Sequence, residues 1–192
     1  DACEVEVACV LEAMYAGRVP PEVRAGDAVP RLVALNKCNA DGTIRGPDDV
    51  RPIGMKSCVA RCAARPLATE VAERHGHRLS LCGQWGSGKR CGVEVVASAI
   101  QLMMELDGLM CFDSEDCINA FNTLDRDVTN TTLQALDNQL WLYWLANYST
   151  AVPQYYRKRD GSLCIPAYSR CGGIQGDNLF SLIFCIVYTE AV

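Results

Sequence analysis

Apolar side chains recur at helical spacing in several segments of the chain. Between positions 59 and 71 they fall three to four residues apart, which predicts a helix over 56–75. Pro66 lies inside this pattern and should kink or split the helix. The same criterion predicts four more helices, over residues 2–16, 93–106, 133–148 and 179–188.

Short apolar runs bounded by turn residues predict strands. The runs at 31–37 and 50–55 are separated by a segment rich in Asn, Asp, Gly and Pro, which predicts two strands joined by a long loop. The runs at 154–159 and 162–168 flank Asp160-Gly161, a pair that favours a tight hairpin turn. A short buried strand is predicted at 109–112. Strands and helices do not alternate strictly, so the predicted fold class is α+β, with an antiparallel sheet packed with helices.

Composition narrows the class of protein further. The chain has 192 residues, 49% of them apolar and 21% charged, which excludes a disordered chain and fits one core or two small lobes. The longest apolar run, 179–188, is far shorter than the roughly 20 residues that a membrane span needs. The chain begins at Asp1 with no basic segment before an apolar one, so we expect no secretory signal. We therefore expect an intracellular protein, nuclear or cytoplasmic, with no membrane partner.

Cysteine is unusually frequent. Twelve cysteines make up about 6% of the chain, below the 8 to 10% or so that is typical of disulfide scaffolds. There is no Cys-x-x-Cys pair and there are only two histidines, so a structural zinc site is not expected. The sequence therefore predicts that most cysteines are free thiols in the core. A non-catalytic, cysteine-rich interaction module remains an alternative.

Formal charge is segregated along the chain, although the net charge is only 18 − 23 = −5. Residues 56–78 carry five basic and two acidic side chains, a net of +3, and residues 105–127 carry one basic and seven acidic ones, a net of −6. Residues 151–171 are basic again. An acidic segment between two basic ones is compatible with a metal and phosphate site, but such runs are more often solvated surfaces.

A glycine-rich loop gives the first functional hypothesis. Gly83, Gly88 and Lys89 match the phosphate-binding pattern G-x-x-x-x-G-K, between a predicted strand and a predicted helix. That motif needs Ser or Thr next, to place a hydroxyl on Mg²⁺, but here the next residue is Arg90. A nucleotide hydrolase using Gly83–Lys89 is therefore a second alternative.

Four motifs in a fixed order give the main hypothesis. They are Arg51-Pro52-Ile53-Gly54; Gln84-x-Gly86 followed by Gly92-x-Glu94; Asp116-Cys117-Ile118-Asn119-Ala120-Phe121-Asn122; and Gly173-Ile174-Gln175-Gly176-Asp177, which leads into an apolar helix. This order resembles the reverse transcriptase domain of non-LTR retrotransposons, whose pattern is R-P-I, Q-x-G and G-x-E, D-x-x-N-A-F-N, then Q-G-D-P-L. The resemblance covers roughly residues 30–192.

The resemblance implies an RNA-directed DNA polymerase. Such an enzyme extends a DNA primer on an RNA template with deoxynucleoside triphosphates, through an in-line phosphoryl transfer between two Mg²⁺ ions. Carboxylates hold these ions. In this family one aspartate comes from the first palm strand and two from a later Asp-Asp hairpin. The match places the first at Asp116, and the chain reaches Val192 before the Asp-Asp pair.

The register of the metal ligand has one alternative. The predicted strand at 109–112 runs directly into Asp113, whereas the spacing to Asn119-Ala120-Phe121 selects Asp116. The spacing to the aromatic residue favours Asp116. Phe121 then takes the family's position beneath the incoming sugar, where a ring would clash with a ribose 2′-hydroxyl and favour deoxynucleotides. Phe121 could equally be an ordinary core aromatic.

The resemblance implies further contacts to nucleotide and nucleic acid. Arg51 corresponds to the fingers arginine that binds the incoming triphosphate, since a guanidinium can bind phosphate oxygens bidentately. Lys37 is a second phosphate candidate. Gln175 and Gly176 resemble the glycine loop that lies against template and nucleotide. The expected template and primer contacts are Gly173, Gln175, Arg157 and Lys158.

The chain is thus expected to be the fingers and partial palm of a right-hand polymerase. Residues 1–107 would form an N-terminal helix and the fingers-like region, and residues 108–192 a partial palm-like region. We expect a fragment that is inactive alone, because it carries one of three metal carboxylates. The polymerase hypothesis expects Asp116 at the end of a sheet strand, facing the loop at 173–177 with Arg51 across the cleft. The hydrolase hypothesis expects residues 83–89 to surround an anion site at a helix N-terminus.

Overall fold

The computed structural model describes most of the chain from residue 29 onward. The described residues are 6, 8–10, 12–13, 18–20, 29–46, 49–106, 111, 113, 116–117, 119–158 and 160–191, without the side chains of 165 and 166. The predicted helix over 2–16 lies largely outside them, although described residues 6, 8–10 and 12–13 are helical. The predicted strand at 109–112 lies outside them too, except for residue 111, which is irregular.

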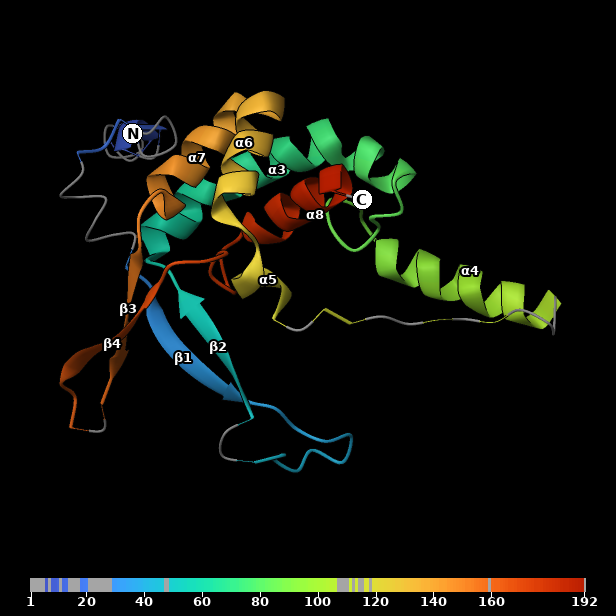
Figure 1. The fold of residues 1–192 in the computed structure, drawn as a ribbon, viewed down its shortest axis with the longest axis horizontal. Coiled ribbons are helices and arrows are strands. Elements are labelled where there is room, and N and C mark those ends of the chain that lie inside the picture. Colours follow the sequence, from blue (N-terminus) through green and yellow to red (C-terminus); the bar gives the residue numbers. More distant parts are fainter. Residues whose placement is uncertain are drawn as a thin grey trace.

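Four strands form one sheet in the order β2-β1-β3-β4 (Figure 1). They are β1 (Arg31–Asn36), β2 (Val50–Met55), β3 (Val152–Arg157) and β4 (Leu163–Ser169). Both predicted strand pairs are confirmed, and each is antiparallel. The two pairs are joined in parallel, with Arg31 opposite Tyr155, so the expectation of a purely antiparallel sheet is wrong at this junction. The fold is nevertheless the predicted mixture of helices and a mainly antiparallel sheet.

Helix α3 (Cys58–Leu81) is longer than predicted and is not split by Pro66. It begins where the Ser57 hydroxyl accepts the backbone N–H of Ala60, at 3.0 Å. Leu67 and Val71 are fully buried, whereas the Pro66 ring is exposed. Burial of the apolar face holds the helix together across a residue that lacks one backbone donor.

The prediction of a single helix over 133–148 is wrong, because Asp137 divides this region between two helices. The structure has α6 (Arg126–Leu136) and α7 (Asn138–Tyr148), with Asp137 extended at φ −153° and ψ 100°. The Asp137 carboxylate accepts the backbone N–H groups of Gln139 and Leu140, at 3.1 and 3.0 Å. This side chain therefore caps a new helix, a role for which aspartate is well suited.

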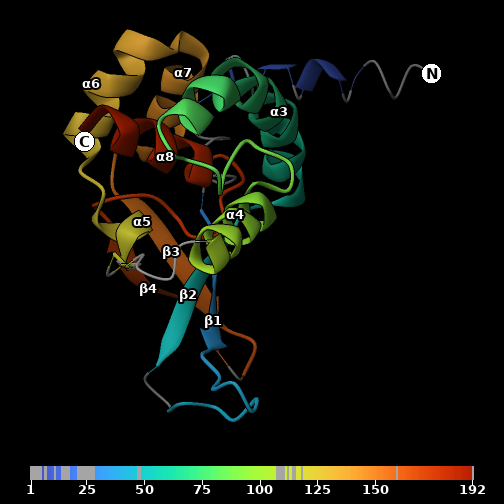
Figure 2. The ribbon, with the colours of Figure 1, turned by 90° about the vertical axis from the view of Figure 1, so that its right-hand side faces the viewer.

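The remaining helices agree with the sequence. Helix α4 (Gly92–Leu106) and helix α8 (Phe180–Ala191) match the predicted ranges, and α5 (Ala120–Thr123) is a single short turn. Figure 1 shows α4 extending away from the other helices, and Figure 2 gives the same ribbon from the side. Most of the apolar side chains of α4 are exposed. Among the described residues, every helix is too short or too polar to reach across a bilayer.

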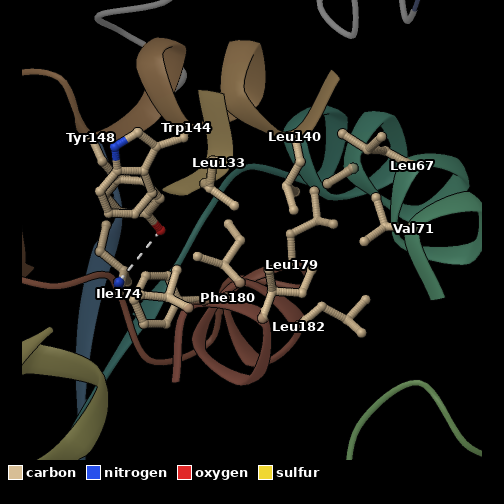
Figure 3. Close-up of a cluster of buried hydrophobic side chains, with 14 of the residues drawn as sticks. Leu67, Val71, Leu133, Leu140, Trp144, Tyr148, Ile174, Leu179, Phe180 and Leu182 are labelled. Atoms are coloured by element: carbon tan, nitrogen blue, oxygen red, sulfur yellow. Dashed lines mark hydrogen bonds between the residues drawn. The ribbon is translucent and has the colours of Figure 1, made fainter. Parts of the chain in front are cut away.

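One hydrophobic core lies between α3, α6, α7 and α8 (Figure 3). Its fully buried members include Leu67 on α3, Leu133 on α6, Trp144 on α7 and Phe180 on α8. Trp144 and Tyr148 lie in this core, as their helical spacing favours. The core takes residues from both sides of the predicted boundary at 107–108. The two predicted regions therefore share one hydrophobic core.

The cysteines do not form the core, contrary to the sequence prediction. Of the described residues, eleven cysteines are free, nine of them exposed and two half-buried. The interior is filled by Leu, Ile, Val and aromatic residues instead. Cys58 and Cys62, for example, lie on the exposed side of α3, opposite its buried leucine and valine side chains. Burial raises the pKa of the Cys185 thiol, although a hydrogen bond with Ser87 opposes this shift.

Candidate functional site

Two motifs far apart in the sequence are joined at one point of the backbone. The N–H of Gly54, at the end of the Arg51-Pro52-Ile53-Gly54 motif, donates to the carbonyl oxygen of Gln175 at 2.7 Å. The 171–177 loop between β4 and α8 is thereby fixed against strand β2. We call this segment the glycine loop.

The glycine loop is also joined to the third motif, which contains α5. The N–H of Gly173 donates to the Phe121 carbonyl at 2.9 Å, and the N–H of Gly172 donates to the Leu124 carbonyl at 2.8 Å. Both glycines are buried. Three of the four sequence motifs thus meet at this loop.

A hollow of about 330 Å³ opens where these motifs meet. Its wall takes Pro52 from β2, Asn122 from α5 and Gln175 from the glycine loop, and the sheet contributes Gln154 and Tyr168. Ser169, Arg170, Cys171 and Ile174 complete the lining. This volume is at the lower end of the range of about 300 to 1,000 Å³ for small-molecule sites. The hollow is the right size for one small polar ligand.

Gly176 must be a glycine because of the backbone beside it. Its φ is +112°, and a Cβ at this position would lie 2.7 Å from the carbonyl oxygen of Gly54. A side chain would therefore be strained and would push the loop away from β2. The close approach of loop and strand depends on this residue.

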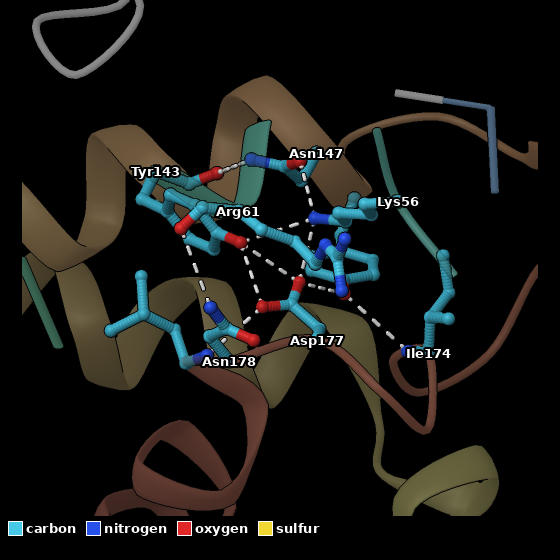
Figure 4. A network of polar contacts seen from close by, with 9 residues as sticks. Lys56, Arg61, Tyr143, Asn147, Ile174, Asp177 and Asn178 are labelled. Atoms are coloured by element: carbon cyan, nitrogen blue, oxygen red, sulfur yellow. Dashed lines mark hydrogen bonds and ion pairs between the residues drawn. The ribbon is translucent and has the colours of Figure 1, made fainter. Parts of the chain in front are cut away.

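A buried ion pair anchors the glycine loop to the body of the protein (Figure 4). The ammonium of Lys56, directly after β2, lies 2.7 Å from Asp177 at the end of the loop. The two side chains are 4% and 0% exposed. Lys56 also donates to the Asn147 side-chain oxygen at 2.7 Å and to the Tyr143 hydroxyl at 3.1 Å.

Asp177 accepts hydrogen bonds on both carboxylate oxygens. The hydroxyls of Tyr143 and Tyr148 donate to it, and the backbone N–H of Leu179 donates at 3.0 Å. Burial alone would raise the pKa of Asp177, but the Lys56 ammonium and these hydrogen bonds outweigh it and lower the pKa. Burial and the Asp177 charge raise the pKa of both tyrosines well above its ordinary value. Asp177 is thus held as a carboxylate and both tyrosines stay neutral donors.

Arg126 holds the other side of the glycine loop. Its guanidinium donates to the carbonyl oxygens of Gly172 at 2.9 Å, Thr150 at 2.8 Å, and Tyr148 and Ser169 at 3.1 Å each. Desolvation lowers its pKa, while the Tyr148 hydroxyl and the Cys171 thiol act in the opposite direction. With its donors directed at four carbonyls, Arg126 fixes the backbone around the site.

The predicted phosphate-binding residues, Arg51 on β2 and Lys37 after β1, do not line the hollow. Arg51 is exposed on β2, opposite Leu35 of β1, and makes no hydrogen bond or ion pair with a described residue. Lys37 forms an ion pair with Asp49 at 2.7 Å, and this hydrogen bond lowers the pKa of the Asp49 carboxyl. Lys37 therefore already has an anionic partner, whereas Arg51 has no direct one among the described residues, although its charge also helps to lower the pKa of Asp49.

Phe121 packs into the core, next to the site. Its ring lies 5.2 Å from that of Phe180 and 5.4 Å from that of Phe184, centroid to centroid. The neighbouring residue Asn122 lines the hollow instead. Gly173 is also packed inside, whereas Gln175 lines the hollow and Gly176 is exposed.

The two candidate metal ligands are exposed and irregular. Asp113 and Asp116 lie outside any helix or strand, so the expectation that Asp116 ends a sheet strand is wrong, and neither aspartate lines the hollow at the glycine loop. Within the part of the chain that the structure describes, no three His, Cys, Asp or Glu side chains lie close enough to share a metal ion. The described residues therefore do not make up a complete magnesium site around either aspartate.

Arg157 and Lys158, the predicted template contacts, lie at the tip of the β3–β4 hairpin. Both side chains are exposed. The Lys158 N–H donates to the Ser162 carbonyl at 2.9 Å, which closes the hairpin around Asp160-Gly161. They lie on the same hairpin as Gln154 and Tyr168, but neither lines the hollow.

The segment at 83–89 is not preceded by the strand that the hydrolase hypothesis expects. Helix α3 continues to Leu81, so the preceding element is a helix. Lys89 lies over the Trp85 ring, with its ammonium 5.6 Å from the ring centroid. The Gly88 carbonyl packs toward Gly76 of α3. This segment packs on its own side chains and on α3, which is not the strand-loop-helix arrangement of a phosphate-binding loop.

Several residues of the site carry no signal in the sequence. Lys56 stands between a strand and a helix like any surface lysine, and its partner is 121 positions away. Gln154, Tyr168 and Arg170 belong to a hairpin whose pairing could be predicted, but whose position beside Pro52 could not. Arg126 lies four residues after the end of the third motif, and this position is the one sequence feature that links it to the site.

Comparison with known proteins adds no relative. Neither a scan against protein-family models nor a search of the curated proteins finds a match to this chain.

Proposed function

We propose that this chain is part of an RNA-directed DNA polymerase, forming its fingers and the first half of its palm. The observation that carries the proposal is the convergence of three motifs, Arg51 to Gly54, Asn119 to Asn122 and Gly173 to Asp177, on one hollow. These segments are those that the resemblance to reverse transcriptases assigns to nucleotide and template binding. Because they line one hollow, a single ligand could contact all three segments at once.

The residues around the hollow divide into supporting and contacting groups. Lys56, Asp177 and Arg126 use their charged groups on one another or on the backbone, so they position the glycine loop. Gln175 lines the hollow, and Arg51 precedes the lining residue Pro52 on β2; neither side chain has a hydrogen bond or ion pair with another described residue. In a polymerase, Arg51 would bind triphosphate oxygens, and Gln175 with Gly176 would lie against the nucleotide and the template base.

The metal chemistry of the proposal rests on the resemblance. Template-directed nucleotidyl transfer uses two Mg²⁺ ions, and Asp116 would supply one of the carboxylates that hold them. Further carboxylates are needed, because the described residues around Asp116 offer no such set. We therefore expect the chain by itself to bind substrates without extending a primer.

Binding of a primed template tests the proposal. The probe is a fluorescent DNA primer annealed to an RNA template, with Mg²⁺ and the next matching deoxynucleoside triphosphate, followed by anisotropy. We expect the matching nucleotide to strengthen the complex more than a mismatched one does. Arg51→Ala should reduce this gain about tenfold, since a charge-assisted hydrogen bond to phosphate contributes about 1.5 to 3 kcal/mol.

Arg65→Ala is the matched control. Arg65 is also an exposed arginine, on α3, and lies outside the hollow. It should leave the nucleotide-dependent gain unchanged. A complex that ignores the nucleotide, or that both substitutions weaken equally, would contradict the proposal and indicate non-specific binding of polyanions.

A further inference from the structure

We propose that the hollow between the sheet and the glycine loop is a binding slot for a single nucleobase. Gln154, Tyr168 and Arg170 of the β3–β4 hairpin would supply its contacts, together with Asn122 and Gln175. The proposal deepens the proposed function and rests on it for the biological source of the base. The chemistry itself is argued from the lining of the hollow.

The polar lining includes three carboxamides whose hydrogen-bonding groups have no partner among the described residues. Asn122, Gln154 and Gln175 come from three different elements, and none of their side-chain amides has a hydrogen bond to another described residue. Gln154 and Gln175 are half-buried, so their amides are partly removed from solvent. Each amide offers both donors and an acceptor. Such groups match the edges of nucleobases, which also present donors and acceptors side by side.

The apolar lining supplies a ring for stacking. Tyr168 is 56% exposed, although it lies in the wall of the hollow. Pro52 and Ile174 contribute further apolar surface from β2 and the glycine loop. Stacking of a base on an aromatic side chain contributes about 1 to 3 kcal/mol and tolerates any base. An exposed tyrosine beside free amides is therefore a suitable platform for a planar heterocycle.

The charge of the lining favours an anionic ligand. Arg170 is the one charged residue among the described residues that line the hollow, and its guanidinium makes no hydrogen bond or ion pair with them. A phosphate attached to the bound base would pair with it. Neutral sugars would leave this cation unpaired, and a simple anion would leave three amides unused. A nucleotide uses all of these groups.

The rate at which Cys171 is alkylated, with and without a bound ligand, tests the slot in the unmodified protein. This thiol is free, exposed and part of the lining, so a bound ligand should slow its alkylation. The probes are adenosine monophosphate, a short single-stranded oligoadenylate, and an abasic strand of equal length. We expect the oligoadenylate to protect Cys171 at least fivefold while Cys38 and Cys58, both exposed elsewhere, react at unchanged rates. Equal protection by the abasic strand would overturn the proposal.

The monophosphate identifies the source of the base. Protection by adenosine monophosphate equal to that by the strand supports a slot for a free nucleotide. Protection by the strand alone supports a slot for an unpaired base of a nucleic acid. No protection of Cys171 by either probe would overturn the slot in both forms.

Paired substitutions on one hairpin give a second readout. Tyr168→Ala should weaken binding of the oligoadenylate about tenfold, the amount expected from loss of one stacking contact. Tyr156→Ala is the matched control, since Tyr156 is also exposed on this hairpin but lies outside the lining. Equal affinities for the two variants would contradict the slot.

The two proposals can fail separately. If the primed template binds in an Arg51-dependent way while Tyr168→Ala has no effect on an unpaired overhang, the slot is wrong and the polymerase proposal stands. If the slot binds single strands but the primed template shows no nucleotide-dependent gain, the polymerase proposal is wrong.

Discussion

Lys56 carries its charge inside the protein, with a side chain that is only 4% exposed. A buried ammonium is tolerated when opposite charge and hydrogen bonds surround it. Asp177, Asn147 and Tyr143 provide this environment, and the rings of Tyr143 and Tyr148 lie 5.1 and 5.3 Å from the ammonium. The pair joins β2 to the last residue of the glycine loop and so couples two parts of the site.

Replacing Lys56 by methionine should destabilise the protein strongly. Lys56→Met leaves the Asp177 carboxylate buried without its counter-ion, and breaking such pairs costs about 3 to 5 kcal/mol. The free energy of unfolding in urea, followed by circular dichroism, gives the value. Lys158→Met, at the exposed hairpin tip, is the control and should change it by about 0.5 kcal/mol or less. Equal effects of the two substitutions would show that the pair does not anchor the loop.

Lys56 also shows where sequence reasoning stops at the residue scale. The resemblance points to Arg51, Gln175 and Gly176 because they stand in short motifs. It is silent on Lys56, because burial depends on how α7 packs over the end of β2. Phe121 is a second example. Its motif position fits a sugar contact and a core position equally well, and only the structure shows that its ring packs against Phe180.

At the scale of elements, the glycine loop is held by backbone contacts on two sides. The N–H of Gly54 donates to the loop, the carbonyl of Phe121 accepts from it, and Gly176 allows the close approach to β2. At its glycine positions, Gly172, Gly173 and Gly176, the loop therefore has no room for a side chain.

Substitution of two glycines with positive φ separates steric contact from backbone strain. Gly161→Ala, in the hairpin turn at φ +85°, has nothing within 4 Å of its new Cβ and should cost about 1 kcal/mol of unfolding free energy. In Gly176→Ala the new Cβ also clashes with the Gly54 carbonyl, so this substitution should cost about 2 to 3 kcal/mol of unfolding free energy. Thermal or urea unfolding of both variants measures the difference. Costs that are the same within error would mean that the loop can move away from β2 freely.

The break between α6 and α7 depends on one carboxylate. Asp137 caps α7, and its other oxygen contacts His75 at 2.8 Å and Arg74 at 3.3 Å. Burial raises the pKa of Asp137, but the contact with His75, the backbone N–H of Leu140 and the charge of Arg74 outweigh it, so the net shift is downward. A depressed pKa contributes stability above the ordinary carboxyl pKa of about 4, and this is lost as the pH falls through the folded value.

Asp137→Asn should therefore show a pH-dependent loss of stability. Asparagine still caps a helix, so the substitution removes mainly the charge-assisted contacts with α3, at a cost of about 1 to 2 kcal/mol at pH 7. The gap between wild type and variant should begin to shrink below about pH 4, where the unfolded chain takes up a proton at Asp137, and should close at the lower pH at which the folded carboxyl is protonated too. Urea unfolding at several pH values measures it. A gap that stays constant down to acid pH would mean that the Asp137 charge contributes nothing.

Most helices and strands could be predicted from the spacing of apolar residues, because each element buries one face and that burial sets the spacing. The strands, α4 and α8 fall where the pattern places them. The break at Asp137 was missed, because apolar spacing continues through it and a capping aspartate looks like a solvent-facing one. Pro66 was given too much weight, since the buried face of α3 stabilises the helix on both sides of it.

At the scale of the whole molecule, the sheet brings the site together. The parallel contact of β1 with β3 places the β3–β4 hairpin beside the strand pair that carries Arg51. This long-range pairing could not be inferred from local patterns, and it is what puts Gln154 and Tyr168 opposite Pro52. The motif order only groups these segments by resemblance, whereas the sheet order brings the β3–β4 hairpin to the hollow that Pro52 also lines.

The central claim is that three separated motifs form one nucleic-acid site, and photo-cross-linking tests it most directly. The probe is a DNA primer on an RNA template that carries 4-thiouridine at the first unpaired position, and the cross-linked peptides are identified by mass spectrometry. We predict cross-links to all three segments around the hollow, at 50–55, 119–123 and 168–176. Cross-links confined to the exposed arginines of α3, or to no defined segment, would contradict the account.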